Sequence, residues 1–221
     1  MQSKQTTNTP RIHTVSLGPY KTNCYVVTHE GSTDCWIVDA SYDPSELIKW
    51  VGNEGLEPKA VMLTHAHEDH IAGLFEVARA FPDAEICIHE AEREWLNDPM
   101  LNLSALSGVP ITGPEPTRFL QPDEQLTLAD QSWKVLYTPG HSPGGIALYH
   151  APSATAFVGD TLFAGAVGRS DFPGSDTATL ARSIRDKLYT LPDHTRIFPG
   201  HGPPSTIGHE KRTNPFVRPL M

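Results

Sequence analysis

Short apolar runs alternate with amphipathic segments along most of the chain. Continuous apolar runs bounded by turn residues predict buried strands, and apolar residues spaced three or four apart predict helices that pack on them. The strands expected from this pattern lie at residues 36–39, 60–64, 86–88, 133–137, 146–149, 156–158 and 197–198. Because strands and helices alternate throughout, the pattern predicts a layered α/β fold.

Helical spacing recurs between these strands. One helix is expected after Pro44, because Leu47 and Val51 then share an apolar face and Gly55 provides an end. The other helices are expected at residues 71–81, 91–97 and 177–188. Residues 98–118 hold four prolines and two glycines, so a long loop is expected there. The pattern therefore predicts a flexible N-terminus at residues 1–10 and a single domain at residues 11–221.

Length and charge narrow the class of partner. The 221 residues suit one domain, and 17 basic against 26 acidic residues give a formal net charge of −9. Nucleic acids and anionic membranes need a basic face, so neither is expected as a partner. Residues 1–20 lack an apolar signal core, and no apolar run approaches the roughly 18 residues of a membrane span. We therefore expect a soluble, cytoplasmic protein.

The three cysteines predict no special chemistry. Cys24, Cys35 and Cys87 leave one thiol over if two pair, and no C-x-x-C spacing is present. Reduced, buried thiols are the expected state in the cytosol. A zinc site built on thiolates is not expected.

The densest polar signal follows the strand expected at residues 60–64. The sequence His65-Ala66-His67-Glu68-Asp69-His70 places three imidazoles and two carboxylates within one short segment. Eleven histidines scattered at random over 221 residues would rarely produce such a run. Imidazoles and carboxylates gathered in this way are typical of a metal site.

Three more ligand-type side chains follow short apolar runs that end in glycine. These are His141, Asp160 and His201, which come directly after Gly140, Gly159 and Gly200. Loops at strand ends are where a rigid scaffold presents functional groups, and glycine lets the backbone pass close to a crowded centre. We therefore add these three side chains to the candidate metal ligands.

The candidate ligands comprise five imidazoles and two carboxylates: His65, His67, Asp69, His70, His141, Asp160 and His201. Seven ligands are too many for one tetrahedral zinc ion. They suit two metal ions that share a bridging carboxylate and leave a position for water. Ligation by nitrogen and oxygen suits Zn, Fe or Mn and does not choose among them.

The motifs resemble the metallo-β-lactamase superfamily over nearly the whole chain, and within it a short form of the glyoxalase II (hydroxyacylglutathione hydrolase) branch. The stretches that carry this resemblance lie at residues 18–25, 64–70, 138–144, 159–163 and 168–174, and at His201. The resemblance implies a four-layer αββα sandwich with the metal ions at one edge, between two sheets. It also implies two divalent ions as cofactors, zinc first, with iron or manganese as alternatives.

Residue roles follow from the same resemblance. It implies that His65, His67 and His141 bind the first ion, that Asp69, His70 and His201 bind the second, and that Asp160 bridges them. The implied reaction is hydrolysis of a thioester of the S-lactoylglutathione type by metal-bound hydroxide, which forms because the metal lowers the pKa of water toward about 7. Asp69 is expected to orient this nucleophile as well. Arg169 matches a basic position near the glutathione carboxylates.

Several alternatives stay open. Only 20 residues follow His201, fewer than the helical C-terminal domain through which glyoxalase II enzymes contact glutathione, so thioester hydrolysis is expected more firmly than glutathione specificity. A mononuclear iron glutathione-persulfide dioxygenase would use His65, His141 and Asp160 as its ligand triad. A lactonase, a β-lactamase and a non-enzymatic metal-binding module are further readings. Zinc β-lactamases typically use a cysteine ligand, and here no cysteine occupies a ligand position.

Overall fold

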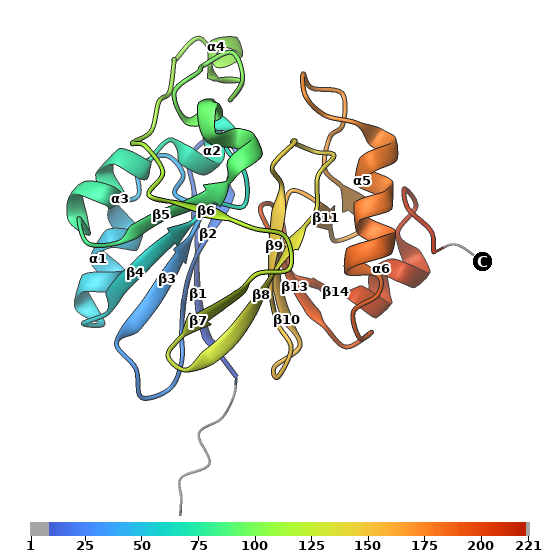
Figure 1. Ribbon diagram of the computed structural model, residues 1–221, viewed down its shortest axis with the longest axis horizontal. Helices are drawn as coiled ribbons and strands as arrows, with labels where there is room; N and C mark the ends of the chain where they lie inside the picture. The colour runs from blue at the N-terminus through green and yellow to red at the C-terminus, as the bar shows by residue number, and fades with distance from the viewer. Residues whose placement is uncertain (1–8, 220–221) are drawn as a thin grey trace, which may run out of the picture.

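A computed structural model describes residues 9–219 and shows two six-stranded sheets packed face to face (Figure 1). The first sheet has the order β1 (Arg11–Leu17), β2 (Thr22–Thr28), β3 (Asp34–Val38), β4 (Glu57–Met62), β5 (Glu85–His89) and β6 (Arg118–Leu120). Its first three strands are antiparallel, and β3 to β6 run parallel. The parallel strands therefore deliver the loops that follow them to one edge of the sheet.

The second sheet is mostly antiparallel. Its order is β14 (Ser205–Thr206), β13 (Arg196–Pro199), β10 (Thr155–Gly159), β9 (Ile146–His150), β8 (Gln131–Tyr137) and β7 (Gln125–Leu128). Only β10 and β13 pair in parallel, so both end at the same edge. A small hairpin of β11 (Leu162–Phe163) and β12 (Ala166–Val167) follows β10.

Helices cover the outer face of each sheet, which confirms the expected four-layer αββα sandwich. Helices α1 (Ser45–Asn53) and α3 (Leu74–Ala80) pack on the first sheet. Helix α5 (Thr177–Ser183), its π-helical continuation (Ile184–Leu188) and α6 (Ile207–Thr213) pack on the second. Figure 1 shows the two sheets between these helical layers.

The alternation of side chains along the strands explains the layers. In β2, Val26 packs toward the helices, whereas its neighbours Tyr25 and Val27 pack into the core between the sheets. Successive side chains of a strand point to opposite faces, so a strand buried on both sides reads as one continuous apolar run. Trp133 and Phe157 fill the same central core from the second sheet.

The helix expected at residues 71–81 is confirmed as α3 (Leu74–Ala80), although it begins three residues later than expected. The structure has a short α2 (Glu68–Ile71), a break, and then α3 from Leu74. Gly73 explains the break, because its N–H donates to the carbonyl of Ala40 at 2.9 Å. A Cβ atom at Gly73 would lie 2.2 Å from the carbonyl oxygen of Ser41. The close approach of these two segments ends α2 and places it beside the end of β3.

Other differences concern short or edge elements. The loop expected at residues 98–118 contains a helical turn, α4 (Ser104–Ser107), and the helix expected at 91–97 is the 3₁₀-helix η1 (Glu90–Leu96). Strands β6, β7 and β14 and helix α6 had no clear apolar pattern of their own. The three cysteines are free and buried, as expected. In the part of the chain described here, no helix has the length and apolarity needed to cross a bilayer. Of the predicted flexible segment 1–10, residues 1–8 lie outside the described residues.

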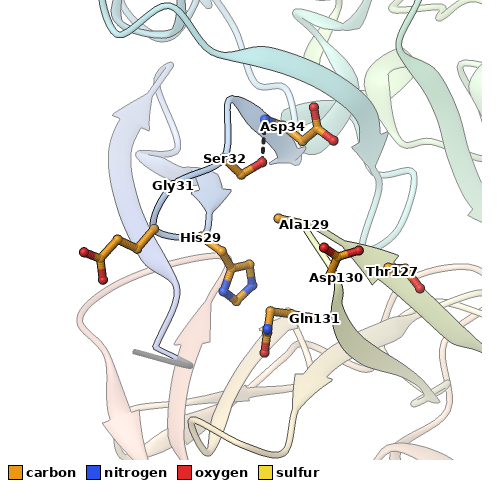
Figure 2. A pocket seen from close by; sticks show the side chains of 9 residues that line it. His29, Gly31, Ser32, Asp34, Thr127, Ala129, Asp130 and Gln131 are labelled. Carbon is orange, nitrogen blue, oxygen red and sulfur yellow. Dashed lines mark hydrogen bonds between the residues drawn. The ribbon is translucent and has the colours of Figure 1, made fainter. Parts of the chain in front are cut away.

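A pocket of about 510 Å³ lies at the far end of β2 (Figure 2). It is formed by the turn between β2 and β3, with His29 and Ser32, and by the turn between β7 and β8, with Asp130 and Gln131. Strand β2 begins at Thr22, which contacts Asp69, and ends just before His29. This pocket is therefore separated from the candidate ligands by the length of the strand.

Candidate metal centre

The structure brings all seven predicted ligand side chains together at one edge of the sandwich. His65 and His67 lie in the loop after β4, Asp69 and His70 in α2, His141 after β8, Asp160 after β10 and His201 after β13. Their ligand atoms form three overlapping groups, each within 4.8 Å: His65 with His67 and His141; His65 with His70 and Asp160; and Asp69 with His70 and His201. Strand ends from both sheets therefore build one compact cluster.

Three imidazoles form the first part of the cluster. His67 Nδ1 lies 2.9 Å from His141 Nε2, which lies 3.2 Å from His65 Nε2. Ligand nitrogens about 2.0–2.1 Å from one metal ion lie roughly 3 to 3.5 Å apart, so this spacing suits a shared cation. Hydrogen bonds alone would not hold His141 Nε2 against His65 Nε2, because each ring carries its hydrogen on Nδ1, where Arg169 O or Thr64 Oγ1 accepts it.

Two imidazoles and two carboxylates form the second part. His201 Nε2 lies 3.1 Å from Asp69 Oδ2, and His70 Nε2 lies 3.5 Å from the same oxygen. Asp160 connects the two parts, because its Oδ1 lies 3.4 Å from His70 Nε2 and its Oδ2 lies 3.6 Å from His141 Nε2. Asp160 therefore lies between the two parts, and the sequence resemblance implies a bridging carboxylate at this residue.

Backbone carbonyls fix the orientation of two imidazoles. His141 Nδ1 lies 2.8 Å from the carbonyl oxygen of Arg169, and His201 Nδ1 lies 3.2 Å from that of Tyr20. A carbonyl oxygen only accepts, so Nδ1 carries the hydrogen and donates it. Each ring therefore turns its Nε2 atom into the cluster, as a metal-binding histidine does.

Asp39 fixes two more imidazoles, and the sequence analysis missed it. Its Oδ2 accepts from His70 Nδ1 at 2.9 Å and from Thr64 Oγ1 at 2.8 Å. Because the Thr64 hydroxyl donates its hydrogen bond to Asp39, its oxygen accepts one from His65 Nδ1, which lies 3.2 Å away. The available signal was that Asp39 ends the apolar run Trp36–Val38, much as Asp160 follows β10.

Glu68, the carboxylate of the histidine run that was not predicted as a ligand, points away from the cluster. Its Oε1 accepts from the hydroxyl of Tyr20 at 3.1 Å. Its Oε2 accepts from Tyr42 at 3.0 Å and from Ser107 at 2.7 Å. Glu68 therefore connects α2 to helical turn α4 at the rim of the site. Neighbouring Asp69 faces the cluster and accepts from Thr22 Oγ1 at 2.7 Å.

The two parts of the cluster differ in charge. Burial lowers the pKa of His67 to about 3 and holds the pKa of His65 well below its usual value, so these imidazoles are neutral. Burial opposes protonation of His201 too, but hydrogen bonds to Asp160 and Asp69 outweigh it and raise its pKa to about 9. The carboxylates of Asp69 and Asp160 therefore stabilise positive charge beside them, and a proton on His201 supplies it when no metal ion is bound.

Unsatisfied buried atoms show that the residues fit metal ions. Within the described residues, His70 Nε2 and Asp160 Oδ1 are buried and have no hydrogen-bond partner, although both point into the cluster. Leaving a buried polar atom unpaired costs about 1–3 kcal/mol, so such atoms normally have a partner. Neutral imidazoles and carboxylates together are ligands for divalent ions such as Zn, Fe or Mn.

A pocket of about 620 Å³ opens onto this cluster. Its wall is largely apolar and is formed by Leu103, Leu106, Phe163, Val167 and Phe172. Arg169 also lines the pocket, where its guanidinium lies 4.0 Å over the ring of Phe172. The same guanidinium donates to both carboxylate oxygens of Asp171, each at 2.9 Å. Arg169 therefore lies where a substrate would pass, already paired with an acidic neighbour.

An αββα sandwich with a histidine–aspartate metal centre at the base of a pocket defines a metal-dependent enzyme of the hydrolase type. Comparison with known families agrees, because the profile of the metallo-beta-lactamase superfamily matches residues 17–201. The chain belongs to this superfamily.

Two relatives and two solved structures match this chain over nearly their full lengths. The chain is 36% identical to the "Probable metallo-hydrolase YqgX" of Bacillus subtilis, over 91% of this chain and 94% of that protein. It is 34% identical to the hydroxyacylglutathione hydrolase GloC of Haemophilus influenzae, over 93% and 97%. The BLEG-1 B3 metallo-beta-lactamase superposes with a TM-score of 0.89 at 40% identity, over 94% and 99%. TTHA1623 in a di-iron-bound form superposes with a TM-score of 0.84 at 37% identity, over 93% and 100%.

Proposed function

We propose that this protein hydrolyses a thioester of the S-acylglutathione type, with two divalent ions, zinc in the first instance, held by the seven clustered ligands. The observation that carries the proposal is the position of Asp160, whose two oxygens reach both parts of the cluster. The GloC relative supports a glutathione thioester as substrate, and the di-iron form of TTHA1623 supports a two-metal centre.

The first part of the cluster orients its ligands without a net charge. Ions bound here would lower the pKa of water toward about 7 and polarise the thioester carbonyl. The chain contributes fixed lone pairs, because His141 and His65 donate their outer N–H groups to Arg169 O and Thr64 Oγ1. Ligands held in this way need no reorganisation during the reaction, and this preorganisation favours catalysis.

Asp69 is proposed to orient the attacking water. Burial would raise its pKa, but the charge of His70 and the hydrogen bonds from His201 and Thr22 outweigh burial and lower the pKa to about 2. Asp69 is therefore a carboxylate throughout the neutral range and accepts a hydrogen bond rather than donating one. Because Asp69 also lines the pocket, it would reach a water molecule placed between substrate and metal centre.

Arg169 is proposed to bind a carboxylate of the thiol half of the substrate. It is the arginine among the residues that line the pocket, and its fork of N–H groups matches a carboxylate. Its partner Asp171 is highly exposed, with 68% of the side chain accessible. A substrate carboxylate would therefore compete with Asp171 for the guanidinium rather than meet a free one.

Hydrolysis of a β-lactam amide is the second candidate. It is favoured by the 40% identity to the BLEG-1 B3 metallo-beta-lactamase. Both reactions add water to a carbonyl carbon, so the same ligands would serve either one. The apolar pocket wall would suit either an acyl chain or a fused ring.

Protein loaded separately with Zn, Fe(II) or Mn tests the proposal. We expect thiol release from S-lactoylglutathione with about two ions per chain, and slower turnover of a chromogenic cephalosporin. The variant Asp160→Asn, which keeps the shape of the bridge and removes its charge, serves as the matched inactive control. Oxygen uptake with glutathione persulfide by protein holding a single iron, without thiol release, would contradict the proposal. Faster β-lactam hydrolysis would favour the second candidate.

A further inference from the structure

A buried carboxylate outside the ligand set contacts both loops that carry the first ligand group, which consists of His65, His67 and His141. Glu92 lies in η1, between the exposed Glu90 and Glu94, and is itself fully buried. Its backbone has φ −117° and ψ 19°, which departs from helical values at this residue of η1. The sequence gives no sign of the difference, since three glutamates alternate there with other residues.

Each oxygen of Glu92 accepts a hydrogen bond from a different loop. Oε2 accepts from the backbone N–H of Ala66 at 2.6 Å, and Ala66 lies between His65 and His67. Oε1 accepts from the backbone N–H of Gly144 at 2.7 Å, three residues after His141. The first loop follows β4 of one sheet and the second connects β8 to β9 of the other. The carboxylate therefore joins the two sheets at the point where they present the three imidazoles.

The loop that contains Gly144 also packs tightly against the side chain of Glu92. A Cβ atom at Gly144 would lie 2.8 Å from Cγ of Glu92 and 3.0 Å from its Cδ. The second loop therefore approaches the carboxylate as closely as a residue without a side chain allows. Burial raises the pKa of Glu92 to about 7, against hydrogen bonds that lower it, so keeping a carboxyl group here has an energetic cost.

We propose that Glu92 is a positioning residue for the metal centre: its two oxygens hold the His65–His67 loop and the His141 loop at the separation that lets their imidazoles share one ion. Both contacts need an acceptor, and a carboxylate supplies two. A glutamine supplies one acceptor and turns its NH₂ group toward the other backbone N–H. Glu92→Gln therefore breaks one of the two contacts with almost no change of volume.

Cobalt(II) spectroscopy and metal competition test this role without reference to any substrate. In Glu92→Gln we expect the first ion to bind about 10- to 100-fold more weakly, and the visible bands of the cobalt-loaded protein to change in position and intensity. The second group, Asp69 with His70 and His201, should retain its ion. In turnover, kcat should fall while KM changes less than twofold, because Glu92 does not line the pocket.

Glu210→Gln is the matched control. Glu210 is also fully buried and accepts from the N–H of Gly165 at 2.9 Å and from Asn214 Nδ2 at 3.0 Å, but it contacts neither loop of the first ligand group. Its cobalt spectrum and metal affinities should match the wild type. A wild-type spectrum and affinity in Glu92→Gln would overturn the proposal. Should that variant not fold, Gly144→Ala perturbs the same contact while keeping the carboxylate, and it is read in the same way.

Discussion

Asp39 Oδ2 lies 2.9 Å from His70 Nδ1, and both side chains are buried, with 1% and 0% of their surfaces exposed. The same carboxylate accepts from the backbone N–H of Thr64 at 2.8 Å through Oδ1. Asp39 therefore connects the end of β3 to the histidine run that follows β4. It orients one ligand of the second group directly, and through Thr64 it orients His65 of the first group.

Asp39→Asn should weaken metal binding about 10- to 100-fold while leaving the fold intact. Asn keeps the left-handed backbone of this position, where φ is 61°. An asparagine keeps only one acceptor oxygen. Its NH₂ group would therefore replace either the oxygen that accepts from the Thr64 backbone N–H or the oxygen that accepts from Thr64 Oγ1 and His70 Nδ1. Chelator competition measures the affinity. The control is Asp43→Asn, an exposed position with φ of 47°, which should bind metal as the wild type does.

His201→Ala and His67→Ala should separate the two parts of the cluster. His201 belongs to the second group only, so its removal should reduce the metal content from about two ions per chain to about one. His67 belongs to the first group only, and its removal should leave the other ion. Elemental analysis after dialysis measures both. Loss of both ions from each variant would show that the two sites bind only together.

The candidate ligands stand out in the sequence because most of them follow a recognisable strand. The apolar run before His65 and the Phe157–Gly159 run before Asp160 are buried on both faces of their strands, so local pattern and tertiary structure agree there. The layer order came from resemblance to a family rather than from the pattern. Strand β6 has three residues and one buried side chain, which is too short for periodicity to show.

The residues that hold the ligands in place were not predictable in the same way. Glu92 is the same residue type as the exposed Glu90 and Glu94, and what sets it apart is its contacts with two distant loops. Gly73 likewise ends α2 because Ser41 and Ala40 pass close by, at a separation in sequence that periodicity does not detect. Tertiary contacts of this kind decide conformation where the local pattern is neutral.

Arg169 and Asp171 predict opposite effects on substrate binding. If Arg169 binds a glutathione carboxylate, Arg169→Gln should raise KM for S-lactoylglutathione about tenfold and leave kcat within twofold. Asp171→Asn should lower KM, because it releases the guanidinium that now donates to both Asp171 oxygens. A thioester of N-acetylcysteamine, which lacks carboxylates, is the control substrate. Equal effects of Arg169→Gln on both substrates would show that the side chain shapes the pocket without binding charge.

The metal-free protein should show a pH dependence of stability due to Glu92. Burial raises its pKa from 4.5 to about 7, so between these values the folded state holds a proton that the unfolded state has lost. Stability from this group therefore falls as pH rises through that window, by about 3 kcal/mol in all. The difference in unfolding free energy between wild type and Glu92→Gln should fall by a similar amount from pH 4.5 to pH 7. A difference that stays constant with pH would contradict the prediction.

Gly200→Ala should damage the metal centre more than the fold. A Cβ atom there would lie 2.1 Å from Asp160 Oδ1 and 2.7 Å from His70 Cε1, so the added methyl group displaces the bridging carboxylate. Overpacking of this kind costs about 1–3 kcal/mol, and we expect metal affinity to fall at least tenfold.

The control is Gly52→Ala in helix α1, where a methyl group meets nothing within 4 Å and should be neutral or stabilise by up to about 1 kcal/mol. Isothermal titration with metal and thermal unfolding of both variants separate the two effects. Wild-type affinity in Gly200→Ala would mean that the Asp160 carboxylate moves freely without loss of binding, and the bridging assignment would then be wrong.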